Sequence, residues 1–204
     1  ISNGERLLIN KIGIKQWLIC LGIMIVGIVL SVLVSPLVEF MKELRKVYKG
    51  LIGIDIHSLT LDRLSDGTRC LRPVDNIKSW FECADLIQMN EHEFETIAPN
   101  NMEPKDFFLR TCTQMDKIIN LTKGAHGSVS YHINNGQCED FKICPLPEIK
   151  VIDPIGCGDT YFAVFGINYS KTGDINFALR QASLAASLTG SIKGLIDHIW
   201  MQQQ

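Results

Sequence analysis

The most informative segment of this chain reads Asp153-Pro154-Ile155-Gly156-Cys157-Gly158-Asp159-Thr160. Apolar residues before it predict a short strand over 149–152, and the apolar pattern after it predicts a helix from Tyr161. Its two glycines let the backbone turn sharply and approach a ligand closely. The first amide groups of the following helix would point into this turn, together with the positive end of the helix dipole. The segment therefore predicts a site for an anionic group, with the carboxylate of Asp159 at its rim.

A carboxylate beside an anion site repels the bound anion, so its presence there suggests a chemical role. Removing a proton from the group that attacks the anion is such a role, so Asp159 is a candidate general base. The structural alternative is a glycine-rich turn that caps an ordinary helix.

The residues from Asp153 to Phe162 resemble the C-terminal signature of the PfkB carbohydrate kinases, which have the ribokinase-like fold. In that family the second aspartate is the base that deprotonates the substrate hydroxyl, and the amides before it form an anion hole. By position, the resemblance assigns the base to Asp159 and the hole to Gly156, Cys157 and Gly158. It also implies that Asp153 orients the loop or a nearby cation as part of the cofactor site. Ile155 departs from the family, which usually has a small hydroxyl residue there.

Two further motifs match the same family. Asn90 and Glu93 fit its Asn-x-x-Glu motif, which helps to place magnesium and the phosphates, partly through water. A hard cation prefers oxygen ligands and keeps several waters, so two side chains suffice. The alternative, compatible with the first, is a capping box that starts a helix. The segment 122–127 resembles the family's Thr-x-Gly-x-x-Gly turn along the nucleotide, which implies cofactor contacts by Thr122, Gly124 and Gly127.

Two regions allow both a functional and a structural interpretation. Asp55 and His57 follow a predicted strand over 51–56, at the end where open α/β sheets bind ligands. They predict either a substrate contact or, as we favour, a capped strand end. The predicted helix over 175–189 is rich in alanine and serine, which suits either a flat adenine or close helix packing.

Strands and helices alternate from Leu51 onward, which predicts an α/β domain with a parallel sheet. Further helices are expected over 37–48, 77–83, 105–115 and 163–170, further strands over 84–89, 117–122, 128–132 and 138–143, and a loop over 61–76. The resemblance implies a ribokinase-like, Rossmann-type three-layer α/β/α fold with a mainly parallel sheet. We expect residues 37–204 to form the C-terminal part of that domain.

Residues 1–36 form a separate hydrophobic segment. The run from Trp17 to Val34 has eighteen residues without a charge, enough for a minimal transmembrane helix. A pair of buried strands and a mis-joined or frame-shifted sequence are the alternatives. Association with a membrane is therefore the alternative to a cytoplasmic location.

Composition narrows the class of protein. A length of 204 residues suits one good-sized domain, and a net charge of −2 gives no reason to expect a nucleic-acid partner. Seven cysteines without a C-x-x-C pair predict neither a disulfide framework nor a zinc site, and fit a reducing cytoplasm.

The resemblance implies an ATP-dependent kinase that phosphorylates a hydroxyl of a sugar, nucleoside or related small molecule. ATP and magnesium are the implied cofactors, and a monovalent cation and a homodimer are allowed. Because residues 1–36 hold no counterpart of the family's N-terminal strands and lid, a non-catalytic nucleotide-binding or membrane-tethered remnant is the main alternative. A Rossmann-type dinucleotide binder is disfavoured, since no Gly-x-Gly-x-x-Gly follows the first strand.

Overall fold

The computed structural model describes residues 34–99, 102–112, 115–143 and 149–192. The chain divides into two compact units, Ile1–Val47 and Tyr48–Gln204. The described part of the first unit is the helix α3 (Val34–Val47), which confirms the helix predicted there. The predicted apolar run lies outside the described residues except for Val34, and no helix within the described ranges is long and apolar enough to span a membrane. The domain boundary after residue 36 stays a prediction.

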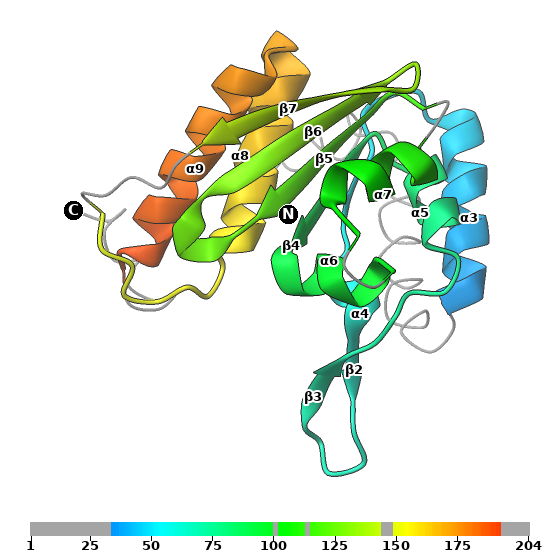
Figure 1. Ribbon diagram of the computed structural model, residues 1–204, viewed down its shortest axis with the longest axis horizontal. Helices are drawn as coiled ribbons and strands as arrows, with labels where there is room; N and C mark the ends of the chain where they lie inside the picture. Colours follow the sequence, from blue (N-terminus) through cyan, green and yellow to red (C-terminus); the bar gives the residue numbers. More distant parts are fainter. Residues whose placement is uncertain (1–33, 100–101, 113–114, 144–148, 193–204) are drawn as a thin grey trace, which may run out of the picture. The chain divides into compact units, whose positions relative to one another are not determined.

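The second unit contains a five-stranded sheet in the order β1-β4-β5-β6-β7 (Figure 1). The pairs β1–β4 and β4–β5 are parallel, whereas β5–β6 and β6–β7 are antiparallel. All strands except β6 therefore run in the same direction, which confirms a mainly parallel sheet. Its strands are β1 (Gly53–Asp55), β4 (Leu86–Asn90), β5 (Lys117–Thr122), β6 (Ser128–Asn134) and β7 (Gln137–Ile143).

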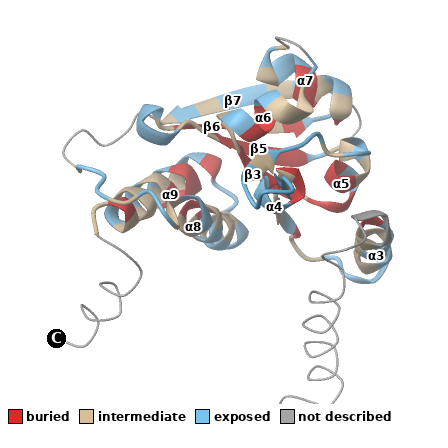
Figure 2. Cartoon of the chain, turned by 90° about the horizontal axis from the view of Figure 1, so that it is seen from below, coloured by how far each residue is buried: buried red, intermediate tan, exposed pale blue. Residues whose placement is uncertain are grey.

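Burial explains why these segments form strands. The apolar side chains of β4 and β5 are buried on both faces, as expected for the centre of a parallel sheet (Figure 2). The hairpin β6–β7 turns at Asn135 and Gly136, whose φ angles are 50° and 75°. Two successive positive φ angles define the two-residue turn that matches strand twist, and Asn-Gly is the sequence that adopts it most readily. This hairpin was predictable from the sequence.

Helices cover both faces of the sheet (Figure 1). On one face Leu86 and Ile118 pack in a core cluster with Phe165 and Leu179. On the opposite face Phe108 lies 5.2 Å from Tyr131, between ring centroids, within a group of phenylalanines. The three-layer α/β/α arrangement is therefore confirmed. The helices of this unit are α4 (His57–Thr60), α5 (Ile77–Cys83), α6 (Glu91–Ile97), α7 (Pro104–Thr111), α8 (Cys157–Thr172) and α9 (Ile175–Gly190).

Two expectations were wrong. The predicted loop over 61–76 contains an antiparallel pair, β2 (Leu61–Arg63) and β3 (Arg69–Leu71). These strands are short and mostly exposed, so their sequence lacks the alternation that marks a half-buried strand. The predicted strand over 149–152 does not form. The backbone amides of Ile152 and Asp153 instead donate to the carbonyl of Gly190, at 2.6 and 3.0 Å.

The helix after the glycine-rich turn also begins earlier than expected. It starts at Cys157 rather than at Tyr161, so Cys157, Gly158 and Asp159 form its first turn.

Close packing of α8 on the sheet predicts the effect of a glycine substitution. A Cβ at Gly53 would lie 2.8 Å from the ring tip of Phe162. We expect Gly53→Ala to lower the free energy of unfolding by about 1–2 kcal/mol, measured by urea denaturation, because the ring must move. Phe162→Leu should remove most of that loss when the two changes are combined.

Gly166→Ala is the matched control, because a Cβ there meets Leu86 at an ordinary 3.6 Å. It should be neutral or stabilising, since alanine favours a helix interior by about 1 kcal/mol. Equal losses from both substitutions would contradict the packing explanation.

Candidate active site

Two cavities adjoin at the carboxyl ends of β4 and β5. The first, which we call the α9 cavity, has a volume of about 300 Å³ and is lined by the small residues of α9 and by the turn after β5. The second, the carboxylate cavity, has a volume of about 270 Å³ and contains Asp55, Glu93 and Asp159. Both are lined by Asn90, Thr122, Pro154 and Gly158. A larger cavity of about 540 Å³ lies beside α6 and the start of α7, and none of the predicted site residues lines it.

The glycine-rich turn has the geometry of an anion site. Gly156 is the N-cap of α8, with φ 81° and ψ −5°, a left-handed conformation that favours glycine. The amide of Cys157 donates to the carbonyl of Pro154 at 3.2 Å. The next amides, of Gly158 and Asp159, have no acceptor within the helix because they belong to its first turn. They are available to an anion, as is the positive end of the helix dipole.

Asp153 and Cys157 contribute to this turn in different ways. One carboxylate oxygen of Asp153 accepts from the amide of Ile155 at 3.0 Å, which fixes the entry to the turn. Asp153 lines neither the α9 cavity nor the carboxylate cavity, so its contact with a cofactor stays a prediction. Burial, with the nearby charge of Asp153, raises the pKa of the Cys157 thiol. Cys157 therefore holds a neutral side chain while its backbone shapes the turn.

A buried amide that the sequence analysis missed joins the sheet to α8. The Nε2 of Gln88 donates to Asp55 Oδ2 and to the carbonyl of Gly158, both at 3.0 Å. Gln88 is 2% exposed, and its Oε1 has no hydrogen-bond partner among the described residues. A polar residue inside the apolar run of β4 was the available signal, because such a group is seldom buried without partners.

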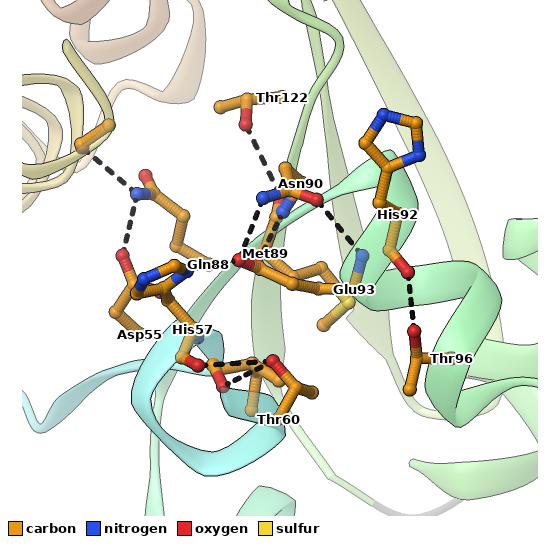
Figure 3. Close-up of polar contacts among 12 residues, drawn as sticks. Asp55, His57, Thr60, Gln88, Met89, Asn90, His92, Glu93, Thr96 and Thr122 are labelled. Carbon is orange, nitrogen blue, oxygen red and sulfur yellow. Dashed lines mark hydrogen bonds and ion pairs between the residues drawn. The ribbon is translucent and has the colours of Figure 1, made fainter. Parts of the chain in front are cut away.

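The Asn-x-x-Glu motif forms a closed set of hydrogen bonds (Figure 3). The Asn90 side chain accepts from the Glu93 amide at 2.9 Å, and Glu93 accepts from the Asn90 amide at 2.8 Å. The Asn90 Nδ2 also donates to Glu93 Oε1 at 2.7 Å, and His57 Nδ1 lies 2.7 Å from the same oxygen. The capping box considered in the sequence analysis is therefore present, and a role of these residues in metal binding stays a prediction.

Asp55 caps the end of β1, as the sequence favoured. Its Oδ1 accepts from the amide of His57 at 2.9 Å. Burial raises the pKa of the Asp55 carboxyl, the amide of His57 opposes this, and the charge of Glu93 raises it further. Both Asp55 and His57 also line the carboxylate cavity.

The turn after β5 brings the remaining predicted residues together. Thr122, Gly124 and Gly127 all line the α9 cavity. The 3₁₀ turn η2 (Gly124–His126) is closed by the Lys123 amide, which donates to the carbonyl of Gly127 at 2.8 Å. Gly127 has φ 86° and ψ −143°, a region essentially restricted to glycine. Opposite this turn, α9 presents Ser183, Ala186 and Ser187 to the same cavity.

Charge makes the carboxylate cavity suitable for a cation. Three carboxylates line it, from Asp55, Glu93 and Asp159, and its described lining contains no lysine or arginine. Oxygen donors suit magnesium. Because the oxygens of Asn90 and Glu93 already accept hydrogen bonds, these two side chains fit a cation that is held through water. In the part of the chain that the structure describes, no three His, Cys, Asp or Glu side chains, these carboxylates included, are grouped so that they could hold a metal ion directly.

A family model and a known relative both match this chain, and both are kinases. The model of the pfkB family carbohydrate kinases matches residues 60–200. The nucleoside kinase of Methanocaldococcus jannaschii is 38% identical over 118 residues, which are 55% of this chain and 35% of that protein.

Solved structures share the ribokinase fold. A pyrophosphate-dependent kinase in the ribokinase family, in a sulfate complex, has a TM-score of 0.64 at 19% identity, covering 77% of this chain and 53% of that one. Arabidopsis thaliana ribokinase with ribose and ATP has a TM-score of 0.60 at 20% identity, and the match covers 78% of this chain and 47% of the ribokinase. The chain thus spans about half of these structures and about a third of the nucleoside kinase.

The raised pKa of Asp55 predicts a pH dependence of stability. The folded protein favours the protonated form of the buried Asp55 carboxyl. The stability that this preference contributes is therefore complete below the pKa of about 4 in the unfolded chain, and it is lost as pH rises through the pKa in the folded protein. The melting temperature of Asp55→Asn, relative to the unaltered protein, should therefore rise between about pH 4 and pH 7.

Asp66 provides a control of opposite sign. The amide of Thr68 donates to this exposed carboxylate at 2.8 Å and lowers its pKa. The stability contributed by the ionised Asp66 carboxylate is present above about pH 4 and is lost as pH falls below it. The difference in melting temperature between Asp66→Asn and the unaltered protein should therefore change only below about pH 4. A flat difference for Asp55→Asn across the range would show that its carboxyl does not titrate abnormally.

Proposed function

This chain belongs to the pfkB family of carbohydrate kinases, and we propose that it forms the donor-binding and catalytic part of an ATP-dependent kinase that phosphorylates a hydroxyl group. The observation that carries the proposal is the first turn of α8. Its Gly158 lines both cavities and its Asp159 lines the carboxylate cavity, beside amides that lack helical acceptors. A candidate base and an anion site therefore lie within one turn of helix.

The α9 cavity supports a nucleotide as the phosphate donor. Its volume of about 300 Å³ is at the lower end of the range for small-molecule sites. Small side chains of α9 face a glycine turn across it, which suits a flat base. Pyrophosphate, the donor named for one structural neighbour, would leave this cavity without a role. ATP, which is bound in the Arabidopsis ribokinase structure, is therefore the donor we propose.

In this mechanism Asp159 accepts the proton of the attacking hydroxyl while the hydroxyl oxygen bonds to the γ-phosphorus of ATP. The bond from that phosphorus to the bridging oxygen breaks at the same time, and ADP leaves. By position in the family motif, the amides of Gly156, Cys157 and Gly158 would face the transferring phosphoryl group. The Gly158 amide is the best placed of the three because it has no helical acceptor, whereas the Cys157 amide already donates to the carbonyl of Pro154. Asn90 and Glu93 would hold magnesium through water, and the bound ion would neutralise part of the phosphate charge. The bond from Gln88 to the Gly158 carbonyl keeps this turn in register with β4.

The acceptor we propose is a nucleoside or a sugar. The relative with 38% identity is a nucleoside kinase, which favours a nucleoside. The matching experiment has two parts: calorimetric titration of the 204-residue chain with ATP and magnesium, and a phosphorylation assay over a panel of nucleosides and sugars. Binding of ATP without turnover would support the alternative of a non-catalytic nucleotide-binding remnant. Absence of ATP binding would overturn the proposed nucleotide site.

Asp159→Asn tests the base in the protein that carries this chain. Asparagine keeps the shape and a hydrogen bond but cannot accept the proton, so turnover should fall by about 10²–10⁴ while ATP affinity changes little. Asp153→Asn is the matched comparison, since Asp153 lines neither cavity, and its effect on the chemical step should be smaller. Near-normal turnover of Asp159→Asn would reduce Asp159 to a residue of the helix terminus.

A further inference from the structure

We propose that Tyr161 is a positioning residue for the proposed base Asp159, because its hydroxyl fixes the first turn of α8 to buried polar side chains of the sheet. This inference rests on the proposed kinase function, in which Asp159 accepts a proton. Tyr161 lines the α9 cavity and directly follows the first turn of α8, but no motif of the sequence analysis assigned it a role.

A row of buried polar side chains crosses the centre of the sheet on the face that carries α8. The register pairs Gln88 on β4 with Asn120 on β5, and Asn120 with Ser130 on β6. Side chains of directly paired residues lie on the same face of a sheet, and these three residues are at most 2% exposed. We call Gln88, Asn120 and Ser130 the polar row. Strands at the centre of such a sheet are normally apolar on both faces, so the polar row needs an explanation.

Buried polar groups hold the first turn of α8 on both sides of Asp159. Before it, Gln88 Nε2 donates to the carbonyl of Gly158 at 3.0 Å. After it, the Tyr161 hydroxyl donates to Ser128 Oγ on β6 at 3.1 Å. The backbone that carries Asp159 is therefore fastened to the sheet from β4 at one side and from β6 at the other.

The polar row also reaches Tyr161 through Ser130, whose hydroxyl is a second hydrogen-bond partner of the phenol. The Ser130 hydroxyl donates to Asn120 Oδ1 at 2.5 Å, so its single hydrogen is used there and its oxygen is left as an acceptor. Burial raises the pKa of Tyr161 to about 12, against the opposing effect of its bonds to Ser128 and Ser130. The phenol therefore stays a neutral donor near pH 7, which suits an anchor.

Packing alone does not require the hydroxyl of Tyr161. Its ring lies in the core cluster and stacks against Phe165, with 6.3 Å between the ring centroids. Phenylalanine would make the same ring contacts without burying a hydroxyl that needs a partner. The polar row is not a closed network either, because Gln88 Oε1 and Asn120 Nδ2 have no hydrogen-bond partner among the described residues. The contacts that these groups do make converge on one turn of helix, which favours positioning as their role.

Tyr161→Phe tests the anchor in the protein that carries this chain. It removes one oxygen atom and keeps the ring. We expect turnover at saturating ATP to fall about 10-fold, because a displacement of roughly 1 Å at a catalytic group can cost as much as about 10²-fold. The KM for ATP and the melting temperature should change little, since the ring still lines the α9 cavity and packs in the core.

Ser128→Ala removes the acceptor of the same hydrogen bond from the other side. If that bond is the cause, Ser128→Ala should also lower turnover, and the variant with both changes should be no slower than Tyr161→Phe alone. Losses that multiply in the double variant would show that the two residues act separately, and would contradict the proposed anchor.

Tyr169→Phe is the matched control. Tyr169 also lies on α8, with its ring 6.1 Å from that of Phe165, but its hydroxyl has no hydrogen-bond partner among the described residues. This variant should keep the turnover of the unaltered protein.

The outcomes separate this inference from the proposed function. Normal turnover in Tyr161→Phe, or a loss that is matched by Tyr169→Phe or by a lower melting temperature, would show that the hydroxyl has no positioning role while the kinase proposal stands. If the unaltered protein neither binds ATP nor phosphorylates any nucleoside or sugar of the panel, both are wrong.

Discussion

The geometry of the candidate site depends on one buried side-chain amide. Gln88, at the centre of β4, donates from a single nitrogen to Asp55 on β1 and to the carbonyl of Gly158 on α8. The parallel register pairs Asp55 directly with Gln88, so the first of these bonds follows from the sheet itself. The second crosses from the sheet to the helix that carries Asp159. Because a buried acceptor that loses its donor costs about 1–3 kcal/mol, any shift of α8 along the sheet is opposed at this point.

The same edge of the sheet concentrates negative charge. Asp55 and Glu93 lie near enough for the charge of Glu93 to raise the pKa of Asp55, and Asp159 lines the same cavity. A site for phosphates has to offset this field. In the described lining the candidates are the backbone amides at the start of α8 and a cation that the oxygen atoms of the cavity would hold. Together these two would let the proposed phosphate site form without a lysine or arginine in its described lining.

Local signals were predictable and long-range ones were not. Gly156, Asp159 and the Asn135-Gly136 turn could be found from the sequence because each depends on the conformation of a few adjacent residues. The continuous apolar runs of β4 and β5 likewise predicted the centre of the sheet. The partners of Gln88 are 33 and 70 residues away, and only the assembled fold brings them within bonding distance. The strands β2 and β3 are each three residues long and mostly exposed, so neither length nor periodicity distinguishes them from a loop.

The missing strand over 149–152 follows from how the glycine-rich turn is held. Its approach is bonded to the end of α9, where Ile152 and Asp153 donate to Gly190, and Thr189 Oγ1 lies 3.2 Å from Thr160 Oγ1 on α8. A Cβ at Gly190 would lie 3.0 Å from Cys157 Sγ, so the contact requires a small residue. The small side chains of α9 that line the α9 cavity lie one to two turns earlier on the same helix. The proposed anion site and the proposed nucleotide site thus share α9 as their support, and a segment fixed to that helix is not free to pair with the sheet.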